Sequence, residues 1–191
     1  MKNETYNRGS IVLHWLMLLL FVLTYATIEL RVIFDRGTPP RDLMKSLHFS
    51  IGMLIFALVW VRLLVRTLTP APAIVPAPPA WQGWAATSVH ALLYAFMIVQ
   101  PLMGWLVLSA AGKPVPFFGL VLPPLMAPDK PFAGTLEEVH QTIGTFGYFL
   151  IGAHALAALV HHYVLKDNTL RRMLPAGRRR AGAAPADARG A

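Results

Sequence analysis

The segment "HQTIGTFGYFLIGAH", residues 140–154, decides the fold. It places a histidine at each end of an otherwise largely apolar run that contains three glycines. The apolar run continues on both sides, over residues 136–165, and exceeds the roughly 20 helical residues that cross the hydrocarbon core of a bilayer. An ionisable side chain within such a span costs free energy, which favours a functional role. The segment therefore predicts a membrane helix that carries two functional imidazoles.

Three further segments of the same kind precede this one. The chain has 191 residues, of which 55% are hydrophobic and only 14% charged, unlike an ordinary soluble domain. The apolar stretches predict four membrane spans, at about 11–34, 47–68, 84–110 and 136–165. The expected fold class is thus an all-α membrane protein, a four-transmembrane-helix bundle formed by residues 1–175. Residues 176–191 form a basic tail without apolar periodicity, which we expect to be disordered.

The basic residues predict the orientation of the bundle. Four spans would leave both termini and the second loop on one side, which then carries eleven basic and three acidic residues. The other side carries six of each. Because Lys and Arg accumulate on the cytoplasmic side, both termini are expected there, in a bacterial inner membrane. The basic tail would lie near anionic lipid, so the high net charge requires no nucleic-acid partner.

The loops have their own signatures. Residues 69–81 are rich in proline and predict an extended spacer on the cytoplasmic side. Residues 112–138 contain several prolines and aromatics and predict a cap on the outer ends of the helices. Thr135, followed by Glu138, resembles a capping box and predicts the start of the fourth helix.

Most of the histidines lie in or at the edges of the spans, and their depths match in pairs. His48 and His140 are expected near the outer face, His14 near the inner face. His154 follows His140 by fourteen residues, about 21 Å along a helix, which brings it to the depth of His14. Fourteen steps of about 100° fall only about 40° short of four full turns, so both rings point to nearly the same face. Two pairs result, His48 with His140 and His14 with His154.

Paired imidazoles from facing helices are the ligand arrangement of a bis-histidine haem. Gly52 and Gly144 each follow a histidine by four residues and leave room for a flat ring on the same face. We therefore expect two haems between the helices, one near each surface. His90, near the inner end of the third span, is either a rival ligand for the inner haem or a hydrogen-bonding residue between helices. A haem-free transporter that uses its histidines as a proton or metal relay remains a separate hypothesis. Because the chain contains no cysteine, disulfides, iron–sulfur clusters, thiolate metal sites and covalent haem attachment are excluded.

Four segments resemble the bacterial cytochrome b561 family, and particularly its superoxide oxidase type. They are "LHW" (13–15), "LHFSIGMLIFALVWVRLLVR" (47–66), "HALLYAFMIVQPLMGW" (90–105) and "VHQTIGTFGYFLIGAHALAALVHHYVLKDNTLRRMLP" (139–175). The resemblance implies a four-helix inner-membrane cytochrome with two b-type haems, ligated at His14, His48, His140 and His154.

The resemblance also implies an oxidoreductase that passes electrons from periplasmic superoxide to ubiquinone. The outer loops carry basic residues that could steer an anion, chiefly Arg41, Lys45 and Lys113, although acidic residues balance them. His161 follows His154 by seven residues on the same face and is a candidate quinone contact, or else an interfacial residue. The alternative function is a membrane-anchor subunit that relays electrons from a periplasmic redox partner.

Overall fold

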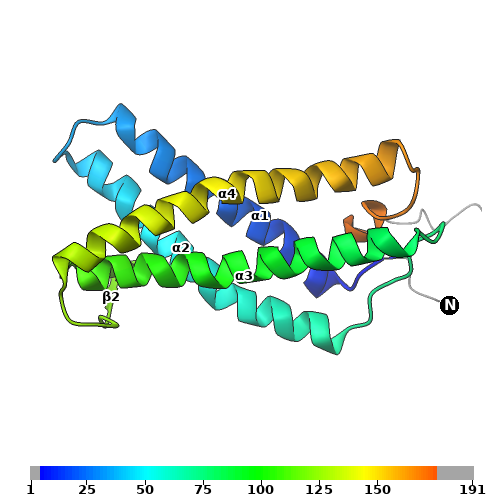
Figure 1. Cartoon of the computed structure of the whole chain (residues 1–191), viewed down its shortest axis with the longest axis horizontal. Helices are drawn as coiled ribbons and strands as arrows, with labels where there is room; N and C mark the ends of the chain where they lie inside the picture. The colour runs from blue at the N-terminus through cyan, green and yellow to red at the C-terminus, as the bar shows by residue number, and fades with distance from the viewer. Residues whose placement is uncertain (1–4, 176–191) are drawn as a thin grey trace, which may run out of the picture.

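The structure is a computed structural model and describes residues 5–175. Four long helices lie together in an elongated bundle: α1 (Arg8–Leu30), α2 (Pro39–Leu68), α3 (Ala80–Ala110) and α4 (Lys130–Tyr163) (Figure 1). Each of the four is long and apolar enough to cross a membrane, so the prediction of a four-helix membrane bundle is confirmed. The predicted disorder of the tail falls on residues 176–191, outside the described residues.

The helices begin three to eight residues before the predicted spans, and the predicted start of the fourth helix was wrong. Thr135 does not begin α4 but lies within it. The helix is capped instead by Asp129, whose carboxylate accepts a hydrogen bond from the backbone N–H of Phe132 at 3.1 Å. Hydropathy reports only the lipid-facing part of a helix, whereas polar caps and N-terminal prolines extend it into water. Consequently His48 and His140 lie well inside their helices rather than at the first turn.

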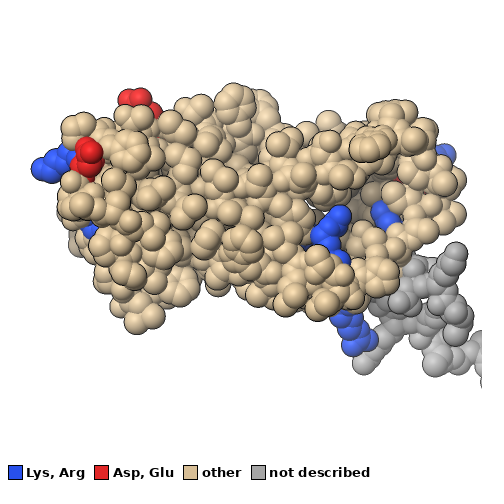
Figure 2. Space-filling model, turned by 60° about the horizontal axis from the view of Figure 1, so that its bottom comes forward, with Lys and Arg blue, Asp and Glu red and all other residues tan. Residues whose placement is uncertain are grey.

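The bundle has a small buried core and a largely apolar exterior. The core comes from α1, α2 and α3 and contains Met17, Leu20, Ile51, Ile55, Val59 and Met97. Large apolar side chains face outward, for example Phe146 and Phe149 on α4, which are 67% and 71% exposed. Figure 2 shows that the charged side chains on the face it presents gather toward the two ends of the molecule. Such an exterior suits lipid, which solvates apolar side chains as readily as a protein core does.

A short hairpin covers the end of the bundle that the sequence predicts to face outward, named the outer end here. Strands β1 (Val115–Phe117) and β2 (Leu120–Leu122) pair in an antiparallel register around a turn at Phe118 and Gly119, which both have positive φ. Ser50 of α2 donates a hydrogen bond to the carbonyl of Pro116 at 3.3 Å and accepts one from the N–H of Phe118 at 3.1 Å. These contacts confirm the predicted cap, and the sequence did not reveal that it contains strands.

The first and last described segments meet at the opposite, inner end. The backbone N–H of Tyr6 donates to the carbonyl of Arg172 at 3.0 Å, and the Trp15 indole donates to the carbonyl of Met173 at 2.8 Å. The Arg172 guanidinium in turn donates to the carbonyl of Pro72, in the loop between α2 and α3. A 3-10 helix, η2 (Arg171–Met173), follows α4 here, and another, η1 (Arg31–Ile33), extends α1 at the outer end.

Candidate functional site

The outer histidine pair consists of His48 on α2 and His140 on α4. Their ring centroids lie 6.4 Å apart. The Nδ1 of His48 lies 3.0 Å from the carbonyl oxygen of Thr24 on α1. Because a carbonyl only accepts, Nδ1 is the donor, and Nε2 keeps its lone pair for a metal.

His140 is positioned by the facing helix α3. The side-chain amide of Gln100 donates to the His140 carbonyl at 2.7 Å, whereas the Nδ1 of His140 is buried without a hydrogen-bond partner. A methyl group at Gly104 would lie 3.3 Å from the imidazole Cε1, so this glycine leaves the ring its space. At Gly52, one turn after His48, no atom beyond the adjacent residues and the backbone of α2 itself lies within 4 Å of the position a methyl group would take. The site therefore has a buried nitrogen without a partner among the described residues, and a glycine on α3 leaves room for the ring that carries it.

The inner pair consists of His14 on α1 and His154 on α4, with ring centroids 6.2 Å apart. The guanidinium Nη2 of Arg62 lies 3.1 Å from the Nδ1 of His14. His90 on α3 also approaches, with its centroid 5.3 Å from that of His154, and its Nδ1 lies 2.6 Å from the carbonyl of Ala86. The structure thus brings together both pairs that the sequence predicts, with His90 beside the inner one.

The ring-centroid separations can be compared with the separation of two imidazoles that bind the same metal ion. An imidazole nitrogen lies about 1.1 Å from the ring centre and binds a metal at about 2.0 Å, so two axial rings have centroids about 6.2 Å apart. Both predicted pairs match this spacing, and the His90–His154 pair is too close for it. Within residues 5–175, no three His, Cys, Asp or Glu side chains are arranged to hold a metal ion. Paired rings without a third ligand fit a haem, which brings its own four equatorial nitrogens.

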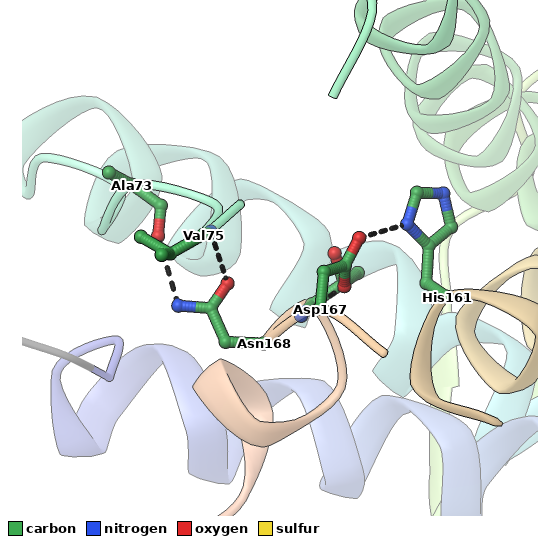
Figure 3. A network of polar contacts seen from close by, with 6 residues as sticks. Ala73, Val75, His161, Asp167 and Asn168 are labelled. Atoms are coloured by element: carbon green, nitrogen blue, oxygen red, sulfur yellow. Dashed lines mark hydrogen bonds and ion pairs between the residues drawn. The ribbon is translucent and has the colours of Figure 1, made fainter. Parts of the chain in front are cut away.

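A polar network surrounds His161 at the inner end of α4 (Figure 3). The Nδ1 of His161 donates to the Asp167 carboxylate at 2.5 Å, and the other oxygen of that carboxylate accepts from the N–H of Thr169 at 2.8 Å. Asn168 ties the same turn to the loop between α2 and α3, through its contacts with Val75 and Ala73. The candidate quinone contact His161 is therefore held in one orientation, with its Nε2 left available.

Asp167 lies outside the membrane-spanning helices and is 6% exposed. Burial acts to raise the pKa of its carboxyl, but the hydrogen bonds from His161 and Thr169 outweigh burial and hold the pKa below its ordinary value of 3.8. A carboxyl whose pKa is lower in the folded than in the unfolded protein stabilises the fold at any pH above the unfolded pKa. This stabilisation is lost as the pH falls through the pKa of the folded protein.

Replacing Asp167 by asparagine is therefore expected to lower the thermal unfolding midpoint at neutral pH. The cost should correspond to about 1.5–3 kcal/mol, as for a hydrogen bond to a charged group. The difference from the wild type should shrink as the pH falls below 3.8. Midpoints measured across this range in detergent test the expectation, and a difference that is constant with pH would contradict it.

The candidate steering residues do not form a free basic patch. Lys45 forms an ion pair with Asp42 at 3.0 Å, and the Arg41 guanidinium donates to the carbonyl of Phe34 at 2.8 Å. Lys113 is exposed and lines a cavity of about 520 Å³ beneath the outer loop. Of the three, Lys113 has the charge best placed to act on an approaching anion.

Sequence reasoning missed two residues of the site. Arg62 and Asp167 entered only as charges that orient the chain, yet each contacts a histidine of the predicted site. A signal for Arg62 exists in the sequence, because it lies within an apolar helix, where a charge indicates function. No such signal exists for Asp167, whose contact with His161 depends on how the chain turns after α4.

Long apolar helices with paired histidines between them define the class of membrane-embedded haem proteins. A family model described as "Prokaryotic cytochrome b561" matches residues 5–176. The chain is 40% identical over 170 residues to "Cytochrome b561 homolog 1" of Escherichia coli, covering 89% of this chain and 97% of the relative. It is also 40% identical over 173 residues to "Probable superoxide oxidase CybB" of Yersinia pestis, covering 91% and 97%. "Cytochrome b561 homolog 2" of Escherichia coli is 30% identical over 175 residues, covering 90% and 92%.

The chain therefore belongs to the prokaryotic cytochrome b561 family. As a member of this family, it is a multi-pass inner-membrane protein that binds haem b and transfers electrons. The residues around the two histidine pairs fit that cofactor.

Proposed function

We propose that this chain binds two haems b and transfers electrons from periplasmic superoxide to ubiquinone in the membrane. The main support is the geometry of the two histidine pairs. Each pair has one member on α4, and in each pair the two rings are as far apart as two imidazoles that bind one iron. His48 and His140 would hold the outer haem, and His14 and His154 the inner one. The name of the Yersinia pestis relative, "Probable superoxide oxidase CybB", supports the choice of donor.

The residues suit electron transfer rather than oxygen chemistry. A bound haem would supply a one-electron carrier, and one histidine from each of two helices would hold it. Two superoxide ions would each give up one electron and become dioxygen. Ubiquinone would take up both electrons and two protons to become ubiquinol. The excess of basic residues at the inner end supports an orientation with both termini in the cytoplasm.

The test combines a spectrum with an assay. The purified protein should show two b-type haems per chain in a dithionite-minus-air difference spectrum, and superoxide should reduce both. Superoxide consumption should rise when ubiquinone is added. Two haems that superoxide does not reduce would contradict the proposed donor and favour an anchor subunit served by a periplasmic redox partner. A purified protein without haem would contradict the proposal and favour a histidine-relay transporter.

His161 is the proposed ubiquinone contact. Its Nε2 is available, its side chain is 20% exposed, and Asp167 fixes the orientation of its ring. We expect His161→Ala to raise the KM for ubiquinone about fivefold to tenfold, the value of one lost hydrogen bond, while both haem spectra persist. His162→Ala is the matched control, since the neighbouring ring points elsewhere on the helix. An unchanged KM in His161→Ala would refute the assignment.

Lys113 is the proposed steering residue for superoxide. Its ammonium should raise the rate of superoxide capture a few-fold at low ionic strength, because screening is weak there. Lys113→Gln should remove most of this salt dependence. Lys166→Gln, an exposed charge at the inner end, should leave it intact. Salt dependence that is equal in all three proteins would contradict steering by Lys113.

A further inference from the structure

Two arginines of α2 lie at the same end of the bundle as the inner histidine pair. Arg62 and Arg66 are four residues apart, so they share one face of the helix. Within residues 5–175, neither forms an ion pair. The Nη1 of Arg62 is buried and has no hydrogen-bond partner among the residues that the structure describes. A buried guanidinium nitrogen without an acceptor costs about 1–3 kcal/mol, so these donors are suited to an anion.

Both arginines line a cavity of about 150 Å³ at the inner end of the bundle. Among the described residues, the rest of the lining carries four hydroxyl groups and no acid: Tyr6, Ser10, Thr69, Ala71, Tyr94 and Met173. Figure 2 shows a hollow at the end of the molecule near the grey residues, with Lys and Arg side chains within it. The chemistry of this cavity is that of a site for carboxylate or phosphate oxygens.

The contact between Arg62 and His14 indicates which anion is expected. A guanidinium can only donate, so the Nδ1 of His14 must accept, and the ring proton must lie on Nε2. A neutral imidazole bound to iron through one nitrogen carries its proton on the other. Whichever nitrogen binds iron, Arg62 loses its acceptor on His14 and requires another one nearby. A haem held at His14 brings such acceptors with it, because the macrocycle carries two carboxylate side chains.

We propose that Arg62 and Arg66 bind the two carboxylates of the haem held by His14 and His154. This inference rests on the proposed function, which includes a haem at that pair. Two guanidinium groups would neutralise two carboxylates and satisfy the buried Nη1 of Arg62. A phospholipid phosphate has similar chemistry, but it would not explain why Arg62 contacts the His14 ring.

The experiment compares Arg62→Gln, Arg66→Gln and Arg62→Lys in the full chain with haem bound. Arg171→Gln is the control, because it removes an exposed charge at the same end of the molecule. The first readout is the haem carboxylate bending band in the resonance Raman spectrum, which responds to hydrogen bonds at these groups. The second is the midpoint potential of each haem in a redox titration.

The bending band of one haem should shift to lower frequency in Arg62→Gln and Arg66→Gln, and Arg62→Lys should restore it in part. The potential of the same haem should fall, because an unneutralised carboxylate stabilises the ferric state. Arg171→Gln should change neither readout. Double substitution should lower inner haem content more than either single one.

Two outcomes would overturn the inference while the proposed function stands. In the first, both haems bind and the glutamine variants keep the wild-type band and potentials. In the second, those variants lose bound anionic phospholipid, measured by lipid extraction, with the haem band unchanged; the cavity then binds a lipid headgroup. A wild-type protein that binds no haem would overturn the proposed function together with this inference.

Discussion

Replacing His48 by alanine should remove the outer haem, and replacing His154 by alanine should remove the inner one. Each variant should therefore retain a single haem per chain. Each histidine belongs to a different pair, with centroid separations of 6.4 and 6.2 Å. An alanine cannot replace an axial ligand, so the affected site should lose its haem or its six-coordinate spectrum. Difference spectra with haem-to-protein ratios measure this loss. Electron transfer from superoxide to ubiquinone should fall to background in both variants.

His90 provides the matched control for the inner site. It lies closer to His154 than His14 does, yet its 5.3 Å separation is shorter than two axial rings require. His90→Ala should therefore retain both haems, and His14→Ala should lose the inner one. The reverse result would make His90 the ligand. If His48→Ala and His154→Ala retained the same haem, with the same spectrum, the paired-ligand proposal would be contradicted.

Replacing Gly147 by alanine should cause the largest loss of stability among the glycine substitutions. A methyl group there would collide with the hydroxyl of Tyr25 on α1 and with the ring of Phe96 on α3. The same tyrosine donates to the carbonyl of Gly144 at 2.7 Å, so it cannot move without breaking a hydrogen bond. We expect a cost of about 3 kcal/mol, at the upper end for an overpacked core. The thermal unfolding midpoint in detergent measures it.

Gly134→Ala is the control on the same helix. No atom lies within 4 Å of the added methyl group, and the residue is exposed. Removing a glycine from a helix interior should stabilise α4 by up to about 1 kcal/mol. Equal midpoints for the two variants would show that α4 tolerates a methyl group at residue 147 and that the close contacts there relax without cost.

The sequence predicted those parts of the site that depend on helix geometry alone. A fixed rise and rotation per residue set the depth and face of His140 and His154, and the structure brings His48 and His14 beside them. That these rings ligate haem stays a prediction. Apolar length likewise predicted four spans, because lipid requires each of them to be helical.

Features that depend on how the helices meet could not be predicted. Arg62 reaches His14 because α1 packs on α2, and Asp167 reaches His161 because the chain reverses after α4. The predicted helix starts lay too far toward the C-terminus. The cap at Asp129 is polar, and hydropathy does not report the polar ends of a membrane helix. The pairing of Val115 with Leu122 depends on a two-residue turn at Phe118 and Gly119. This turn lacks the asparagine or aspartate that usually marks such a turn in a sequence.

Both histidine pairs take one member from α4, the last of the four helices to leave the ribosome. While the chain is being synthesised, His14 and His48 enter the membrane long before their partners exist. Neither pair can form until α4 has been inserted and packed. We therefore expect any cofactor to bind after translation, once α4 has completed both pairs. A chain truncated before residue 130 would insert three helices and complete neither pair.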